Sequence, residues 1–161
     1  MKIGIISDSH DRIEETNKAM EVIKEKGATV LIHCGDFCAP FMMNELSKFE
    51  GEVHCVFGNI DDRFVTPNRA RDLGINFHGD IAELELEGKK IAVNHFQKIA
   101  EALASTGVYD AVFHGHTHVA YKKLIGKTLL ANPGEIMGWK GKPSLAIYDT
   151  ESNEIQHLDV K

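Results

Sequence analysis

Cysteine is scarce in this sequence, and its three copies do not suggest a disulfide framework. Only Cys34, Cys38 and Cys55 occur among 161 residues. An odd number of cysteines without two close pairs is typical of a protein kept in a reducing compartment. We therefore expect a cytoplasmic protein.

Long apolar runs are also missing. The chain passes from Met1 to Asp8 directly into polar sequence. A signal peptide has an apolar stretch of roughly 7–15 residues, and a membrane-spanning helix needs about 20. We expect no membrane role.

Positive charge is in deficit. Lys and Arg total 18 against 24 Asp and Glu, and the formal net charge is -6. A surface that binds long nucleic acids needs clustered Lys and Arg to neutralise phosphates, so we expect no long nucleic acid as a partner. An acidic protein can still receive a small phosphate ester at a bound divalent cation, because the ion reverses the local field.

The apolar residues that are present alternate between strand and helix patterns in the first third of the chain. Short apolar runs at 3–6, 30–32 and 53–57 predict buried strands. Helical patterns lie between them, from Ile13 to a stop at Gly27 and over about 41–48. This β-α-β-α-β order predicts a parallel sheet covered by helices, with loops at the carboxyl ends of the strands available for a site.

The rest of the chain is richer in strands. A hairpin is predicted over 81–93, turned at Gly88, and a short helix near 99–104. Further strands are expected at 111–113, 121–124, 128–131, 144–148 and 155–158. There is no repeat or linker, so we expect a single domain over 1–161 with one sizeable core.

Residues with metal-binding groups follow almost every one of these strand runs. If the strands are aligned in sheets, their ends converge on one edge and bring the side chains into one cleft. The resulting set of seven donors is Asp8, His10, Asp36, Asn59, His95, His116 and His118.

Seven donors are too many for one ion. They suit two divalent cations that share one carboxylate, and Asp36 is the natural bridge. Mixed oxygen and nitrogen ligands without thiolates point to Mn, Fe, Ni, Co or Zn, with Mn favoured, and away from a closed structural zinc site.

The motif order resembles the calcineurin-like metallophosphoesterases. It comprises Asp8-Ser-His10, Gly35-Asp36, Gly58-Asn59-Ile-Asp61, Asn94-His95 and Gly115-His116-Thr-His118. The chain looks most like the short bacterial and archaeal phosphodiesterases, whose Asn-Pro-Gly element is matched by Asn132-Pro133-Gly134. One such piece recurs by chance, but five in order rarely do. The resemblance spans nearly the whole chain and implies an α/β fold with a two-sheet mixed β sandwich flanked by helices.

The resemblance also implies a ligand set. One ion would be held by Asp8, His10, Asp36 and His118, and the other by Asp36, Asn59, His95 and His116. Two cations about 3.5–4 Å apart clamp a phosphoryl group and lower the pKa of a bridging water, so that hydroxide attacks phosphorus in line. The expected function is that of a dinuclear-metal-dependent phosphoesterase, preferentially a phosphodiesterase. Its expected catalytic residues are Asp36, Asn59, His95 and Asp61. A homodimer is plausible by family analogy alone.

Two positions depart from the family pattern. Members often carry a His after Gly-Asn, paired with an acidic residue, which protonates the leaving oxygen; here the position is Ile60, beside Asp61. A positioned general acid contributes about 10²–10⁴ in rate, so we expect a preference for acidic leaving groups such as aryl phosphates. The second departure is Glu135, where the short phosphodiesterases more often have Ser. Its carboxylate could repel a dianionic monoester or point into solvent.

Other interpretations stay open. The fold also occurs in the retromer subunit of eukaryotic cells, which acts by protein contacts, and the loss of the acid at Ile60 fits such a scaffold. The complete ligand set favours catalysis. A metal-dependent nuclease would need a basic track that the sequence lacks. Asp36 could instead cap a helix, and Pro133 and Gly134 could simply form a turn. His33, His114, Cys34 and Cys38 are expected to pack near the site rather than bind metal.

Overall fold

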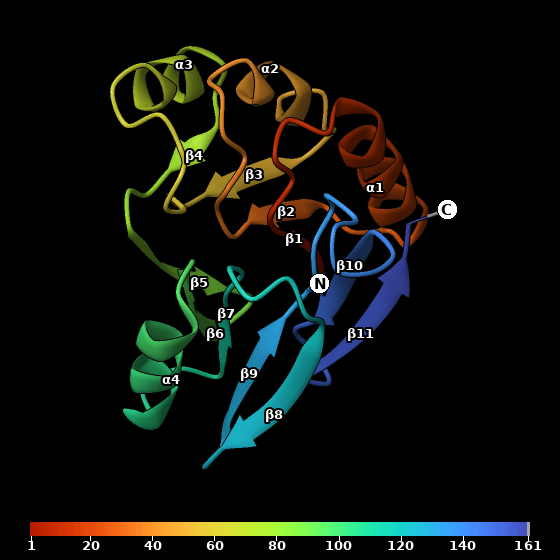
Figure 1. Cartoon of the computed structure of the whole chain (residues 1–161). Helices are drawn as coiled ribbons and strands as arrows, with labels where there is room; N and C mark the ends of the chain where they lie inside the picture. Colours follow the sequence, from red (N-terminus) through yellow and green to blue (C-terminus); the bar gives the residue numbers. More distant parts are fainter. Residues whose placement is uncertain (161) are drawn as a thin grey trace.

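The computed structural model describes residues 1–160 and contains two β-sheets stacked face to face, with helices on their outer faces (Figure 1). The first sheet has the strand order β11-β10-β1-β2-β3-β4. Its strands are β1 (Lys2–Ile6), β2 (Val30–His33), β3 (Glu52–Cys55), β4 (Asn76–Phe77), β10 (Ser144–Asp149) and β11 (Glu154–Asp159). Strands β1 to β4 are parallel to one another, whereas β10 pairs in antiparallel fashion with both β1 and β11.

The second sheet has the order β5-β6-β7-β9-β8. Its strands are β5 (Ile81–Leu86), β6 (Lys89–Asn94), β7 (Ala111–Phe113), β8 (Tyr121–Ile125) and β9 (Thr128–Asn132). The three central strands are parallel, and the two edge strands are antiparallel to their neighbours. The predicted two-sheet mixed β sandwich flanked by helices is therefore confirmed.

Within residues 1–160, four helices cover the outer faces of the sheets. Along the first sheet lie α1 (Ile13–Glu25), α2 (Met42–Leu46) and α3 (Thr66–Asp72), and α4 (Gln97–Ser105) covers the second sheet (Figure 1). Helix α1 buries Thr16, Ala19, Met20 and Ile23, the spacing of one helical face. The central apolar layer lies between the two sheets and includes Ile5, Ile32, Val93 and Phe113.

The register of the parallel strands brings their carboxyl ends level. Ile6 of β1 pairs with His33 of β2, which in turn pairs with Cys55 of β3. In the second sheet Val93 of β6 pairs with Phe113 of β7. The loops that leave these five strands therefore emerge together, as the polar residues at the strand ends predicted.

The sequence patterns missed two elements, α3 and β4. Helix α3 buries only Thr66 and Ala70, so it carries no apolar periodicity, and β4 has two residues. The predicted strand at 53–57 is also too long: β3 ends at Cys55. Val56 and Phe57 still pack in the core, and their N–H groups donate to the carbonyls of His33 and Gly79 outside the strand.

Among residues 1–160, no helix has the length and hydrophobicity needed to cross a membrane.

Candidate metal centre

The loops that carry the predicted ligands are tied to one another by backbone hydrogen bonds. The N–H of Asp8 donates to the carbonyl of Gly35 at 3.0 Å, and the N–H of His10 donates to that of Asp36 at 3.0 Å. The loops after β6 and β7 are joined by a 3.1 Å bond from Gly115 N to the carbonyl of His95. A link between the sheets comes from His116 N, which donates to the Asp8 carboxylate at 3.1 Å.

Five of the predicted ligands adopt the left-handed backbone region that non-glycine residues seldom occupy. The φ angles are 53° at Asp8, 44° at His10, 58° at Asp36, 68° at His116 and 60° at His118. A left-handed backbone conformation costs of order 1–3 kcal/mol at each such residue, and it persists only where surrounding contacts impose it. Such strain gathered in one place is typical of a functional site.

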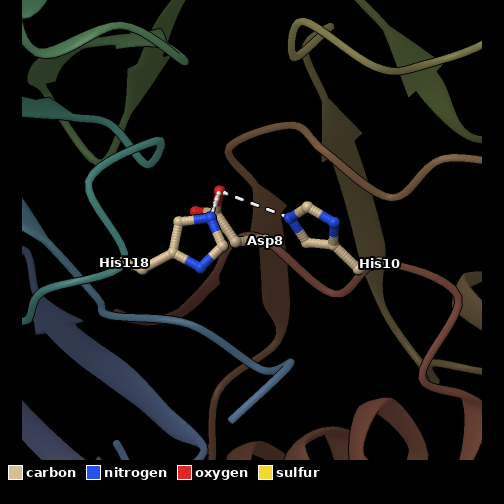
Figure 2. A group of neighbouring side chains, drawn as sticks. All are labelled: Asp8, His10 and His118. Carbon is tan, nitrogen blue, oxygen red and sulfur yellow. Dashed lines mark ion pairs between the residues drawn. The ribbon is translucent and has the colours of Figure 1, made fainter. Parts of the chain in front are cut away.

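A first group of side chains consists of Asp8, His10 and His118, one ligand atom of each lying within 4.8 Å of the others. Figure 2 shows both imidazoles directed at the Asp8 carboxylate from opposite sides. Atom Nε2 of His118 lies 3.2 Å from Asp8 Oδ1, and Nε2 of His10 lies 4.0 Å from it. The His10 nitrogen is buried and has no hydrogen-bond partner among the described residues.

A second group consists of Asp36, His95 and His116, again within 4.8 Å. Atom Nε2 of His95 lies 3.3 Å from Asp36 Oδ2 and 3.1 Å from Asn59 Oδ1. The same Asn59 oxygen is 2.8 Å from His116 Nδ1. Because Asp36 Oδ2 also lies 3.8 Å from His10 Nε2, it stands between the two groups.

The hydrogen bond at His95 Nδ1 indicates that the space in front of Nε2 fits a cation. Its Nδ1 lies 2.8 Å from the Cys34 carbonyl oxygen, which can only accept, so Nδ1 must donate. In the neutral ring Nε2 then presents a lone pair to the oxygens of Asp36 and Asn59. Lone pairs facing at such distances repel one another unless a proton or a metal ion lies between them. The donor set of imidazole, carboxylate and amide oxygen therefore fits divalent cations.

The short distances between the imidazoles and the carboxylates also shift the pKa values of these groups. Burial opposes a charged His95, but its hydrogen bond to Asp36 and the nearby carboxylates raise its pKa above the ordinary value. Burial also opposes a charged Asp36, yet the His95 contacts hold the pKa of that carboxyl below its usual range. Burial raises the pKa of Asp8. A cation at the centre would displace the imidazole proton and compensate both carboxylates.

Neither group of possible ligands among the described residues includes a cysteine. Burial raises the pKa of Cys38 to about 12 and also raises that of Cys34. A packing role for both thiols stays a prediction.

The carboxylate of Asp61 lies beneath the ligand loops. It accepts hydrogen bonds from the backbone N–H groups of Asp36 at 3.0 Å, Cys38 at 2.7 Å and Gly58 at 2.6 Å. Burial raises its pKa to about 6, although these donors favour the charged form. The residue thus holds the Asp36 loop against the Asn59 loop; its direct role in catalysis stays a prediction.

The structure assigns contacts to several residues that the sequence left open. Glu135 is 1% exposed and its Oε2 lies 2.5 Å from His118 Nδ1, so the alternative that it points into solvent is wrong. Asp36 caps no helix, because α2 begins at Met42 without a side-chain cap. In the Asn-Pro-Gly element, Asn132 Nδ2 donates to the Gly115 carbonyl at 2.9 Å and steadies the last ligand loop. No sequence signal identifies the Glu135 contact, which joins residues 17 positions apart.

Gly115 allows the loop after β7 to pass close to Asp8. A Cβ at this position would lie 1.9 Å from Ser7 Oγ and 2.5 Å from Asp8 Oδ2. We expect Gly115→Ala to lose about 1–3 kcal/mol of stability by overpacking and to bind metal more weakly, since Asp8 must move. Urea unfolding and calorimetric metal titration measure both effects. The matched control is Gly141→Ala, where a Cβ meets no atom within 4 Å; equal behaviour of the two variants would contradict the prediction.

Two buried histidines outside the ligand set predict that the fold weakens in acid. Burial lowers the pKa of His33 to about 3 and that of His114 to about 4. The unfolded chain takes up protons below a pKa near 6.5 that these rings refuse when folded, so their stabilisation is present above pH 6.5 and is lost as the pH falls. For His114 the expected loss between pH 7 and pH 5 is about 2 kcal/mol.

Urea unfolding of the metal-free protein across that range tests this prediction. The His114→Gln variant should show a shallower pH dependence, because one titrating ring is gone. An unchanged pH slope in the variant would show that His114 is readily protonated in the folded protein.

Comparisons with known sequences place this chain in a wider family. The chain matches the calcineurin-like phosphoesterase superfamily domain over residues 1–153. A phosphodiesterase of Methanocaldococcus jannaschii is 32% identical over 163 residues, which cover 98% of each chain. A probable metallophosphoesterase of Bacillus subtilis is 28% identical over 138 residues, or 84% of this chain and 75% of the relative.

Comparison with solved structures agrees with this family match. An archaeal phosphodiesterase superposes with a TM-score of 0.92 at 32% identity and covers 99% of each chain. A vacuolar sorting protein, Vps29 of Entamoeba histolytica complexed with Zn²⁺, covers 100% of each chain with a TM-score of 0.69, but at 16% identity this likeness concerns the fold alone. Because the family match covers residues 1–153, and because the M. jannaschii relative is 32% identical over 98% of both chains, this chain belongs to the calcineurin-like phosphoesterase superfamily.

Proposed function

We propose that this protein is a dinuclear-metal-dependent phosphodiesterase acting on small phosphate esters. The observation that carries the proposal is the meeting of two imidazole–carboxylate groups at one oxygen, Asp36 Oδ2, which lies 3.3 Å from His95 and 3.8 Å from His10. The family supports a phosphoesterase, and the M. jannaschii relative is named a phosphodiesterase.

Two ligand sets follow from this arrangement. One cation is assigned to Asp8, His10, Asp36 and His118, and the other to Asp36, Asn59, His95 and His116. When bound, such cations supply the positive charge that attracts a phosphate ester and lowers the pKa of water enough for it to act as a nucleophile near neutral pH.

The chain's own residues orient the reaction. The Ile60 N–H donates to Asp36 Oδ1 at 3.2 Å, which leaves Oδ2 free to face the ligand imidazoles. The Cys34 carbonyl fixes the His95 ring through Nδ1. His116 and Asn59 are the ligands most exposed to solvent, whereas Asp8 and His95 are buried. A substrate therefore reaches the centre from the side of His116 and Asn59.

No side chain in the position after Asn59 can donate a proton to the leaving oxygen. Ile60 is apolar and 47% exposed, and the Asp61 carboxylate is occupied by three backbone donors. Acidic leaving groups, which depart without a general acid, are thus preferred. This favours esters of an aryl or similarly acidic alcohol.

We predict that Ile60→His accelerates cleavage of poor leaving groups more than good ones. The new imidazole would lie next to Asp61 at the open side of the centre and could protonate the departing oxygen, a contribution of up to about 10²-fold for alkyl esters. The dependence of kcat on leaving-group pKa should become shallower across a series of aryl and alkyl diesters. Equal rate changes across that series would contradict the assignment.

The finer properties of the enzyme are also proposals. Mixed nitrogen and oxygen ligands suit Mn, Fe, Ni, Co or Zn, and Mn is our first choice among these ions. The protein is inferred to act in the cytoplasm, where thiols such as Cys34 and Cys55 stay reduced. We also infer that the chain forms a single domain and, by family analogy alone, that it associates as a homodimer.

Metal reconstitution tests the proposed function. Protein stripped with a chelator is reloaded with Mn²⁺, Co²⁺, Ni²⁺, Zn²⁺ or Mg²⁺. Turnover of bis-aryl phosphates, mono-aryl phosphates and a long polynucleotide is then compared with bound metal per chain. The expected result is two ions per chain and faster turnover of the diester. Binding without turnover of either ester would favour the scaffold alternative, whereas cleavage restricted to long polynucleotides would favour the nuclease.

A further inference from the structure

Glu135 lies directly behind one ligand of the proposed centre. Its Oε2 is 2.5 Å from Nδ1 of His118, while Nε2 of the same ring lies 3.2 Å from Asp8 Oδ1. The carboxylate is 1% exposed, so it cannot exchange this partner for water. The imidazole is therefore held between two carboxylates, one on each nitrogen.

The second oxygen of Glu135 binds the loop that follows. Oε1 accepts hydrogen bonds from the backbone N–H groups of Lys140 and Gly141, the latter at 3.2 Å. This loop presents Trp139, whose ring centroid lies 5.6 Å from that of His118, edge to face. The Lys140 ammonium closes the loop by donating to the Thr117 carbonyl at 2.9 Å. One buried carboxylate thus joins a ligand imidazole to a backbone loop.

The direction of each hydrogen bond follows from the chemistry of Glu135. An ionised carboxylate can only accept, so His118 Nδ1 must donate to it. The neutral ring then carries its lone pair on Nε2, the atom that faces Asp8 and His10 in Figure 2. The contact therefore orients the ring and also selects the nitrogen that can bind a metal ion.

We propose that Glu135 is a positioning residue that holds His118 in the metal-binding tautomer and anchors the Trp139 loop beside it. The inference rests on the proposed function, because it assigns His118 to the cation at Asp8 and His10. It gives Glu135 a role in metal affinity, in place of the repulsion of monoesters that its charge alone suggested. A buried partner of this kind typically contributes about 10–100-fold in metal affinity.

Glu135→Gln separates this role from simple packing. A glutamine has one acceptor oxygen and one NH₂ group, so it must offer one of them to His118 and the other to the backbone of the Trp139 loop. The oxygen is expected to stay with the two backbone donors of Lys140 and Gly141, which turns the NH₂ group toward His118 Nδ1. Nδ1 must then accept, so the proton moves to Nε2 and the ring loses its metal-binding lone pair. The variant is expected to keep the Trp139 loop in place but to leave His118 unable to bind the metal ion.

The single tryptophan of the chain provides a local readout. Co²⁺ bound next to His118 should quench Trp139 fluorescence, because the ring lies 5.6 Å from that imidazole. In Glu135→Gln we expect an emission spectrum like that of the wild type without metal, and a quenching midpoint shifted to about 10–100-fold higher Co²⁺. Calorimetry should show that the other metal site is unchanged. Glu101→Gln, an exposed change on α4 with Lys123 and Gln97 as its hydrogen-bond partners, is the matched control.

Three variants distinguish the outcomes. Glu135→Ala releases both partners, so it should change the metal-free emission as well as the midpoint; if it fails to fold, Glu135→Gln still decides the question. A midpoint in Glu135→Gln equal to that of the wild type would overturn the inference while leaving the metal centre intact. His118→Ala should abolish the quenching. If the wild type itself shows no saturable quenching and binds no Co²⁺, the proposed function fails and the inference fails with it.

Discussion

Asp36→Asn is expected to reduce turnover of a bis-aryl phosphate by about 10³-fold or more, because it removes the one charge shared by both groups of ligands. The amide can keep the hydrogen bond that Ile60 N–H makes with Oδ1 at 3.2 Å. It then places an NH₂ group at the Oδ2 position, where donors would face His95 and His10. The side chain thus keeps its shape but loses both its charge and its accepting oxygen.

Bound metal per chain and kcat, measured on the same preparation, test this prediction. The metal content should fall from two ions to one or fewer, and unfolding in urea should show that the chain still folds. Asp110→Asn is the matched control, since Asp110 is a carboxylate outside the centre that accepts from Lys90 N at 2.9 Å. If Asp36→Asn matches the wild type in both metal content and turnover, the assigned centre is wrong.

The location of the site was predictable because its residues follow apolar strands. Runs such as Ile3 to Ile6 are buried over four consecutive positions, and the polar residues directly after them therefore stand at a sheet end. Parallel pairing of β1 with β2 and of β2 with β3 then brings Asp8, Asp36 and Asn59 toward one region. The sequence predicted this convergence from strand pattern and motif order.

The relations between the two sheets could not be predicted in this way. Patterns along the chain indicate that a residue is buried, but they do not identify its partner across a core. The bond from His116 N to Asp8 joins positions 108 residues apart, and the bond from His118 Nδ1 to Glu135 crosses between loops. Helix α3 escaped detection for a related reason: it is short and mostly exposed, so no apolar repeat marks it.

Asp61 shows most clearly what sequence patterns cannot predict. Its position in the motif suggests a catalytic role, whereas its contacts suggest that it holds the ligand loops in place. By sequence it follows Asn59 and Ile60 and is expected to be catalytic. In the structure its two oxygens receive N–H groups from Asp36, Cys38 and Gly58. A carboxylate with these three donors serves to hold together the loops that carry two ligands.

Asp61→Ala is therefore expected to destabilise the fold by about 3 kcal/mol or more, because each of the three N–H groups left without an acceptor costs roughly 1–3 kcal/mol. Metal affinity should fall with it, since the Asp36 and Asn59 loops lose their common anchor. Asp61→Asn keeps one accepting oxygen, so it should lie between the wild type and the alanine variant in both properties. Unfolding free energies and metal titrations measure this order.

Measurements of kcat then distinguish a role of Asp61 in holding the loops from a direct role in catalysis. If the residue acts by holding the loops, the loss of kcat in Asp61→Asn should be the same for good and poor leaving groups and should be partly restored by excess metal, which favours the folded, loaded state. A proton donor would behave differently: stability and metal content would stay near wild type, while cleavage of poor leaving groups alone would slow. That second result would restore the catalytic assignment and would show that the three backbone donors leave the carboxyl group able to reach the substrate.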